Sequence, residues 1–289
     1  MTTTDTHPEE ETMTQRVALV TGASSGIGEE TARRLASRGV TVYGAARRAD
    51  RLASLASDGV RSLVMDVTDE DSVTRSVSHL LDEAGRIDLL VNSAGYGTLG
   101  SVEETPLEDG RQLFDVNLFG AMRLIQLVVP QMRRQRSGRI INVSSVGGRV
   151  PTPLGSWYHG SKFALEAMSD TLRFELRQFG IDVVVIEPGG TQTEWAEIAV
   201  DHIQSNSGSG AYARQAEAVA RSLVSERERS RHAPASLVAD TIVRAATARK
   251  PKTRYPVGPG VRLAIALRRI LPDRAFDRVM SRASGVPLG

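Results

Sequence analysis

The sequence contains no cysteine, which excludes disulfide bonds, thiolate catalysis and cysteine-based zinc sites. Aromatic residues are also scarce, at 4% of the 289 residues, and the five histidines are scattered without the spacing of metal ligands. We therefore expect no metal site. A chain without cysteine suits a reducing compartment, so we expect a cytoplasmic protein.

Strong net charge and long apolar runs are missing as well. The net charge is +2, from 36 Lys and Arg against 34 Asp and Glu, and the two signs are interspersed, so we expect no nucleic-acid partner. No run approaches the roughly 18 apolar residues of a membrane span, so we expect none. Residues 1–14 are rich in Thr and Glu without an apolar core, which predicts a disordered leader and no secretory signal.

Lysine is avoided throughout residues 1–249, with one exception at Lys162. Tyr158 stands four residues earlier, and residues four apart in a helix lie on one face. An ammonium about 4 Å from a phenol, at an effective dielectric near 20, is worth roughly 4 kcal/mol or about 3 pKa units. The pair predicts an acid–base unit in which Lys162 lowers the pKa of Tyr158. A solvated helix face is the structural alternative.

Apolar runs alternate with helical patterns along most of the chain, which predicts a parallel sheet covered on both faces. We expect an α/β fold, a doubly wound Rossmann-type sheet with helices on both faces, in a single domain over residues 15–258. The expected strands are 16–21, 40–46, 60–65, 87–92, 139–144, 181–186 and 253–257. A long helical region is expected over residues 108–136, and the helix that carries Tyr158 is expected to run to Phe179.

A glycine loop joins the first strand to the first helix, with Gly22, Gly26 and Gly28 in the pattern G-x-x-x-G-x-G. Glycines let a pyrophosphate approach closely, and the helix amino end supplies N–H donors and a positive dipole. A simple turn is the alternative, but the strand–loop–helix context favours dinucleotide binding. The second expected strand ends before Arg47 and Arg48, with no acid in place to hold a ribose hydroxyl. We therefore expect NADP(H), with NAD less favoured and Arg47 as the main phosphate contact.

Together these motifs resemble the short-chain dehydrogenase/reductase family, in its single-domain branch. The resemblance covers residues 17–193, about two thirds of the chain, and departs from the usual pattern at Ser93, where the family often has a second Asn. The matching segments are Thr21-Gly22-Ala23-Ser24-Ser25-Gly26-Ile27-Gly28, Asn92-Ser93-Ala94-Gly95, Asn117, Ser144-Ser145, Tyr158 to Lys162 and Pro188-Gly189.

The resemblance implies catalytic roles for four residues. Tyr158 is the general acid or base at the substrate oxygen, and Lys162 lowers its pKa and binds the nicotinamide ribose. Ser145 polarises the carbonyl, with Ser144 as the alternative because neighbours on a strand face opposite ways. Asn117 positions a water beside Lys162.

The resemblance also implies the cofactor contacts. The glycine loop, with Ser24, Ser25 and Ile27, would hold the pyrophosphate region. Asp66 and Val67 would contact the adenine, and Asn92, Ala94 and Gly95 would line the adjoining ribose, although Asn92 alternatively only ties neighbouring strands together. Pro188, Gly189 and Thr191 would contact the nicotinamide. The family's usual assembly implies a homodimer or homotetramer through the two long helices.

The remaining third of the chain bears on the substrate. Residues 190–232 contain a Ser/Gly-rich break at 205–210, and an active-site lid and a surface insertion are equally open. The C-terminal tail, 259–289, is amphipathic with Leu263, Leu267, Ile270 and Leu271 as the expected packed stripe; peripheral membrane contact is the less favoured reading.

The part of the chain after Pro188 is similar in length to the corresponding segment of hydroxysteroid and retinol dehydrogenases. This resemblance implies that the substrate is a bulky lipophilic ketone or alcohol. Leu154, Trp195 and the segment to Val200 are candidates to line its pocket, and Trp195 is alternatively plain core. Two other functions stay open: a non-catalytic NADP-binding sensor or partner protein, and an NAD(P)-dependent isomerase or dehydratase. The intact set of Ser145, Tyr158 and Lys162 argues against the first, and the glycine spacing disfavours the second.

Overall fold

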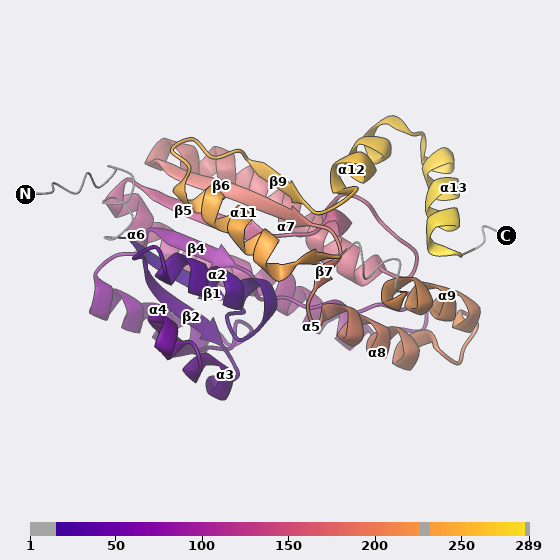
Figure 1. Ribbon diagram of the computed structural model, residues 1–289, viewed down its shortest axis with the longest axis horizontal. Coiled ribbons are helices and arrows are strands. Elements are labelled where there is room, and N and C mark those ends of the chain that lie inside the picture. The colour runs from indigo at the N-terminus through magenta and orange to yellow at the C-terminus, as the bar shows by residue number, and fades with distance from the viewer. Residues whose placement is uncertain (1–15, 226–231, 287–289) are drawn as a thin grey trace, which may run out of the picture.

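The computed structural model describes residues 16–225 and 232–286 (Figure 1). The predicted leader, residues 1–14, lies outside the described residues, as do residues 226–231 of the predicted lid and the last three residues of the tail.

Within the described part of the chain, seven parallel strands form the central sheet in the order β3-β2-β1-β4-β5-β6-β9. This confirms the predicted doubly wound α/β fold in a single domain. The strands are β1 (Val17–Thr21), β2 (Thr41–Ala46), β3 (Val60–Val64), β4 (Leu89–Asn92), β5 (Gly138–Val143), β6 (Ile181–Pro188) and β9 (Arg254–Val257).

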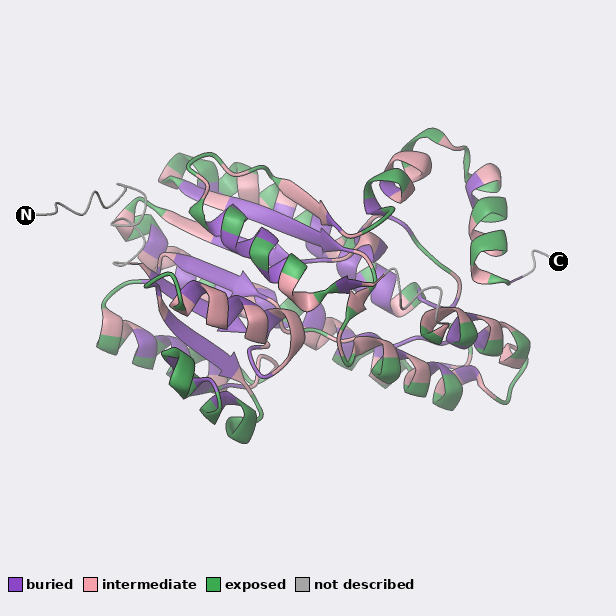
Figure 2. Ribbon diagram, in the orientation of Figure 1, coloured by how far each residue is buried: buried purple, intermediate pink, exposed green. Residues whose placement is uncertain are grey.

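Helices cover both faces of the sheet, which explains why the central strands are continuous apolar runs. All five residues of β1 are buried, because its alternate side chains enter opposite cores. Figure 2 shows the buried sheet between helices whose outer sides are exposed. One face carries α2 (Gly26–Ala36) and α11 (Ala235–Thr247); the other carries α4 (Glu70–Ala84), α6 (Gly120–Gln135) and α7 (Ser156–Leu176).

The ends of α4 show how local sequence sets an element boundary. The Asp69 carboxylate accepts a hydrogen bond from the Ser72 backbone N–H at 3.0 Å, which satisfies one free donor of the first turn. Gly85 ends the helix in the left-handed conformation, with φ of 69°. The short helices are α3 (Ala49–Ala53), η1 (Ala56–Asp58), η3 (Val146–Gly148) and η4 (Arg177–Phe179).

The long helical region expected over 108–136 is interrupted in its middle. It consists of α5 (Leu107–Phe114), a π-helical turn η2 (Asp115–Phe119) and α6. Residues Leu107–Gln135 are long and apolar enough to cross a membrane by length and composition, contrary to the expectation that the chain has no such segment. The segment packs on the sheet through Leu124, Ile125 and Val128, so we interpret it as a core helix.

The segment after β6 forms two helices joined by a short link. α8 (Trp195–Ser207) runs further into the Ser/Gly-rich stretch than expected, and α9 (Ala213–Val224) follows. A two-stranded parallel sheet of β7 (Thr191–Gln192) and β8 (Ala233–Pro234) holds the ends of the segment together. Ala199, Ile203 and Ala216 of these helices pack with Leu99 and Tyr158 in a third apolar cluster.

The apolar stripe expected in the tail is wrong at two of its four residues, whereas Leu267 is half-buried and Leu271 packs on the tail cluster. The tail forms α12 (Val261–Ile270) and α13 (Asp273–Ser284), and in α12 Leu263 and Ile270 are 63% and 77% exposed. Val261 and Ile265 are buried instead, because they pack against Val150 and against Phe276 of α13. The packed face of α12 is therefore rotated away from the expected stripe.

We predict that Arg139→Met destabilises the fold. The Arg139 guanidinium donates to the carbonyl oxygens of Ala245, Ala246 and Ala248 at 2.7–2.8 Å, which holds the end of α11 on β5. Removing a charged donor from partly buried carbonyls should lower the free energy of unfolding by about 2–3 kcal/mol. Urea unfolding followed by circular dichroism measures it.

Arg134→Met is the matched control, because Arg134 is exposed on α6 and should change stability by no more than about 0.5 kcal/mol. Equal stability losses in the two variants would contradict the role of Arg139.

Candidate active site

A cavity of about 930 Å³ opens at the carboxyl ends of the central strands, at the crossover between β1 and β4 where the strand order reverses. This is where open parallel sheets bind ligands. Most predicted site residues line it: Gly22, Ser24, Ser25, Gly26, Ile27, Gly28, Arg47, Asp66, Val67, Ala94, Gly95, Ser145, Tyr158, Lys162, Pro188, Gly189 and Thr191. Asn92 and Asn117 do not line the cavity. Of the residues expected to line a substrate pocket, Trp195 lines the cavity and Leu154 does not.

The glycine loop fits a pyrophosphate because its backbone has no room for side chains. Gly22 has φ of 68°, and a Cβ there would lie 3.0 Å from the Ala94 backbone. A Cβ at Gly28 would lie 2.3 Å from the Gly22 carbonyl oxygen. The loop therefore lies directly against the first turn of α2, whose N–H groups face the cavity end where a dinucleotide phosphate would sit.

Arg48, for which the sequence predicts no role of its own, lies beside Arg47 and contacts the glycine loop. Its guanidinium donates to the hydroxyls of Ser24 at 3.1 Å and Ser25 at 3.0 Å. Arg47 also lines the cavity, but makes no hydrogen bond or ion pair with any described residue. Glu194, at the start of α8, pairs with Arg48 at 3.5 Å and Arg51 at 2.8 Å. A basic subsite with two hydroxyls therefore borders the adenine side of the cavity.

Asp66 also lines that side, at the end of β3. Its carboxylate accepts hydrogen bonds from the backbone N–H and the hydroxyl of Thr68, at 2.9 and 2.8 Å. These bonds fix the turn after β3 and leave the second carboxylate oxygen without a hydrogen-bond donor among the described residues, in line with a contact to an adenine amine.

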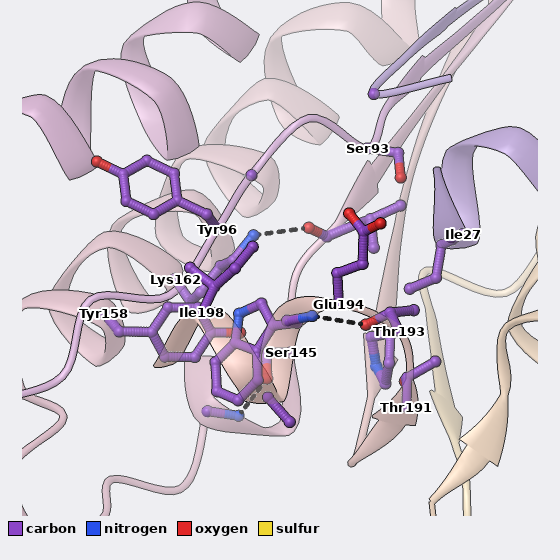
Figure 3. Close-up of a pocket in the computed structure, with 18 of the residues that line it drawn as sticks. Ile27, Ser93, Tyr96, Ser145, Tyr158, Lys162, Thr191, Thr193, Glu194 and Ile198 are labelled. Carbon is purple, nitrogen blue, oxygen red and sulfur yellow. Dashed lines mark hydrogen bonds between the residues drawn. The ribbon is translucent and has the colours of Figure 1, made fainter. Parts of the chain in front are cut away.

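Tyr158, Lys162 and Ser145 come together at the other end of the cavity (Figure 3). Tyr158 and Lys162 lie one turn apart on α7 and are only 8% and 6% exposed, which excludes the solvated helix face. The Lys162 ammonium donates to the Val143 carbonyl oxygen at the end of β5, at 3.0 Å. Ser145 follows that strand and hydrogen-bonds with the Tyr158 hydroxyl.

The pKa of Tyr158 shifts opposite to the sequence expectation. Burial raises the pKa of Tyr158 to about 12, and the hydrogen bond with Ser145 opposes that rise only in part. Burial also lowers the pKa of Lys162 to about 8, against the opposing charge of Glu166. Both groups share one apolar environment that disfavours their charged forms, so the phenol keeps its proton at neutral pH.

Both asparagines make hydrogen bonds within the protein. The Asn117 side chain, placed by the π-helical turn, accepts from the Tyr96 N–H and donates to the Tyr96 carbonyl, both at 3.0 Å. A Cβ on Gly95 would lie 2.9 Å from the Asn117 oxygen and 3.5 Å from the Lys162 nitrogen, so Asn117 stands behind the cavity wall beside Lys162. Asn92 donates to Asn142 at 2.9 Å, which ties β4 to β5.

Of the two adjacent serines, Ser145 faces the tyrosine. The Ser144 hydroxyl points towards Gly148 and Glu166, since a Cβ on Gly148 would lie 2.7 Å from its oxygen and 3.0 Å from the Glu166 side chain. The Ser145 oxygen accepts from the Gly147 N–H at 3.0 Å, which fixes its direction. The geometry therefore favours Ser145 over Ser144.

A buried charge cluster behind Lys162 was missed in the sequence. Glu166 lies one turn further along α7 and pairs with Arg254 of β9 at 3.0 Å; Glu187 of β6 pairs with Arg149 at 3.2 Å. Burial raises the pKa of both Glu166 and Glu187. Only the four-residue spacing from Lys162 to Glu166 signals the cluster in the sequence, because its other members come from separate elements.

His159 is a second residue whose role was missed in the sequence. Its ring accepts the Thr152 N–H at Nε2, at 3.0 Å, so Nδ1 carries the hydrogen and donates to the Gly147 carbonyl at 2.8 Å. Cβ atoms at Gly147 or Gly155 would collide with the ring, at 2.8 and 2.4 Å. His159 thus fastens the segment after Ser145 to α7, and burial lowers its pKa.

Trp195 closes the cavity over Tyr158, with ring centroids 5.2 Å apart. It is the first residue of α8, next to Glu194. One turn of the predicted lid therefore contacts both the basic subsite and the tyrosine, although a lid function stays a prediction.

Known proteins with related sequences span nearly the whole chain. The short chain dehydrogenase family matches residues 16–203. A probable short-chain type dehydrogenase/reductase of Helicobacter pylori, VdlC, is 34% identical and covers 90% of this chain and 95% of its own length. A 3-ketodihydrosphingosine reductase of Bacteroides thetaiotaomicron is 35% identical over 92% of this chain and 96% of its own.

Solved structures agree in fold. A short-chain dehydrogenase from Streptomyces avermitilis is 32% identical with a TM-score of 0.76, covering 93% of this chain and 95% of that one. An NAD⁺-bound xylitol dehydrogenase is 29% identical with a TM-score of 0.74, covering 85% and 98%. An actinorhodin polyketide ketoreductase with NADPH is 27% identical with a TM-score of 0.74, covering 86% and 98%.

We predict that His159 makes folding stability depend on pH. Its folded pKa lies below the ordinary 6.5, so the unfolded chain binds the proton first as the pH falls. This contribution is complete above pH 6.5 and is lost as the pH falls from 6.5 towards the folded pKa, with a slope of up to about 1.4 kcal/mol per pH unit. His159→Gln should flatten the slope, measured by urea unfolding across that window.

His79→Gln is the control, because the His79 side chain is 66% exposed and its removal should leave the slope unchanged. A wild-type slope in the His159→Gln protein would rule out this contribution.

Proposed function

The chain belongs to the short-chain dehydrogenase/reductase family, and from that premise we propose that it is an NADP(H)-dependent oxidoreductase acting on a ketone or secondary alcohol. The observation that carries the proposal is the convergence of Ser145, Tyr158 and Lys162 at one end of a cavity whose other end is the glycine loop.

The proposed chemistry is proton transfer by the protein beside hydride transfer by the cofactor. The bound nicotinamide supplies or accepts the hydride. Ser145 and Tyr158 donate hydrogen bonds to the substrate oxygen, which stabilises the negative charge that grows there during reduction. Tyr158 then gives its proton to that oxygen and takes it back in the reverse direction.

The pKa directions suit Tyr158 as the proton donor. With its pKa raised to about 12, the phenol holds its proton at neutral pH and is ready for the reduction of a ketone. Lys162, with a pKa of about 8, is mostly an ammonium at pH 7 and favours the phenolate that remains after proton transfer.

Support for NADP(H) comes from the basic subsite. Arg48, Ser24 and Ser25 form a set of donors beside Arg47, and no carboxylate occupies the position after β2 that would hold a ribose hydroxyl. Guanidinium and hydroxyl donors suit a phosphate dianion. The related structures with bound cofactor include both NAD⁺ and NADPH, which supports a nicotinamide cofactor of either kind.

Support for a bulky lipophilic substrate comes from the side of the cavity beside Tyr158. Apolar side chains from the β4 loop, α8 and α9 line it: Leu99, Trp195, Ile198, Val219 and Leu223. We propose a steroid-, retinoid- or similar lipophilic carbonyl compound. The relative named 3-ketodihydrosphingosine reductase, which has a keto substrate by its name, supports a ketone as the substrate class.

Support for a homodimer or homotetramer comes from exposed aromatic side chains on the long helices. Phe119, Phe163 and Phe174 are 52%, 41% and 77% exposed on η2 and α7. Large exposed apolar side chains gathered on two helices suit an interface between copies of the chain. A cytoplasmic location remains part of the proposal, supported by the absence of cysteine.

We predict that Tyr158→Phe abolishes most turnover. The substitution removes the proton donor and preserves the ring, so kcat should fall by about 10²–10⁴ while the dissociation constant for NADPH stays within about threefold. The measurements are loss of reduced-nicotinamide absorbance with a panel of lipophilic ketones and a fluorescence titration with NADPH.

Tyr96→Phe is the matched control, since Tyr96 also lines the cavity and its hydroxyl points away from Ser145 (Figure 3). Turnover within a few-fold of wild type in the Tyr158→Phe protein would reject the assignment.

We predict that Arg48→Ala weakens NADPH binding selectively. Losing a charged donor to the 2′-phosphate should raise the dissociation constant for NADPH by about 10- to 100-fold and leave that for NADH nearly unchanged. Arg47→Ala should act in the same direction. Arg51→Ala serves as the control, because Arg51 pairs with Glu194 and does not line the cavity. Equal losses for the two cofactors would refute the phosphate role.

A further inference from the structure

The positive charge of the chain is concentrated in its last 40 residues, contrary to the even distribution expected from the sequence. Residues 250–289 contain nine Lys and Arg and two Asp, a net charge of +7. Residues 1–249 contain 27 Lys and Arg and 32 Asp and Glu, a net charge of −5. The overall charge of +2 hides this asymmetry, and such asymmetry indicates an extended anionic partner.

Most of the arginines on the two tail helices are free to meet that partner. Arg268 pairs with Asp273 at 2.9 Å. Within the described chain, the other five are exposed and make no ion pair or side-chain hydrogen bond: Arg262, Arg269, Arg274, Arg278 and Arg282. Arginines that pair with acidic residues inside the fold, such as Arg139 of β5 and Arg254 of β9, lie outside these two helices.

The outer face of α12 is apolar beside these arginines. Leu263 and Ile270 are seven residues apart, so they lie two turns apart on one face, and both are largely exposed. Arg262 and Arg269 immediately precede them and form a parallel ridge along the helix. The buried face, through Val261 and Ile265, fixes α12 on the body and keeps this outer face turned outwards.

The same helices also border the cavity. Ala264 of α12 and Met280 of α13 line it from the side of the tail. Figure 1 shows α12 and α13 at the end of the molecule where α8 and α9 lie, away from the N-terminus. A surface that bound the outer side of α12 would therefore lie next to the cavity.

We propose that the outer face of α12, together with the arginines of α13, docks on the surface of a bilayer that contains anionic phospholipid. The arginines pair with the lipid phosphates while Leu263 and Ile270 enter the apolar boundary beneath them. A second copy of the chain is disfavoured as the occupant, because two tails (259–289), each with six Arg and two Asp and a net charge of +4, repel each other. A nucleic acid would match the arginines but leave the Leu263–Ile270 ridge without an apolar partner. The proposal does not depend on the oxidoreductase function.

The test is co-sedimentation of the full chain with vesicles. One preparation contains phosphatidylcholine alone, and the other contains three parts phosphatidylcholine to one part phosphatidylglycerol. We expect binding to the anionic vesicles only, weakening as salt is raised through the physiological range. The double variant Arg262→Gln/Arg269→Gln should lower the partition coefficient by roughly 10- to 30-fold, at about fivefold for each arginine. Leu263→Ser/Ile270→Ser should lower it by at least about tenfold.

Two controls separate the proposed face from general surface effects. Leu237→Ser changes an exposed apolar side chain on α11, and Arg133→Gln/Arg134→Gln removes two exposed arginines on α6; both should bind like wild type. Circular dichroism checks that every variant is folded, and the charge variant tests the proposal independently of the apolar one.

Three results would overturn the proposal. The first is no vesicle binding, or equal binding to both vesicle types. The second is binding of single-stranded RNA without vesicle binding, by fluorescence anisotropy, which would identify a nucleic-acid surface. The third is a loss of self-association in the Leu263→Ser/Ile270→Ser variant without vesicle binding, which would identify a second copy as the occupant.

Discussion

The burial of Lys162 beside Tyr158 is the constraint on which the rest of the site depends. A charged lysine that is only 6% exposed is costly unless its surroundings compensate for lost water, and here a strand-end carbonyl accepts a hydrogen bond from its ammonium. That carbonyl belongs to Val143, the last residue of β5, where the hydrogen-bonded ladder of the sheet ends. The same edge supplies Ser145, so sheet and helix α7 must meet in a single register for the three side chains to converge.

Through the buried charge cluster behind Lys162, the site also depends on residues from distant parts of the chain. Glu166 faces Lys162 from the next turn, and its carboxylate is held by Arg254 of the last strand, β9. Arg149 and Glu187 complete the cluster from the loop after β5 and from β6. Removal of one partner from such a buried network leaves an uncompensated charge, so β9 supports the site electrostatically as well as extending the sheet.

Much of the site is predictable from short segments, and the mistaken predictions involve contacts between segments. The glycine loop, Tyr158 and Lys162 were identified because each acts through its immediate neighbours. The contacts of Arg48 were not predicted, because which of two adjacent arginines turns towards Ser24 and Ser25 depends on the path of the chain after β2. The tail stripe was wrong at Leu263 and Ile270, because the face of α12 that is buried depends on what it packs against, here Val150 and Phe276.

The sequence by itself determined the parallel α/β architecture, the order of the motifs along the chain and the placing of Tyr158 and Lys162 on one side of a helix, since periodicity and short spacings act over a few residues. Only the tertiary structure decided the direction of the tyrosine pKa shift, the fastening of the Ser145 segment by His159, and the side of α12 that faces solvent. Those properties depend on burial and on the distances between segments remote in the chain, and neither quantity can be derived from the residues that are neighbours in the sequence.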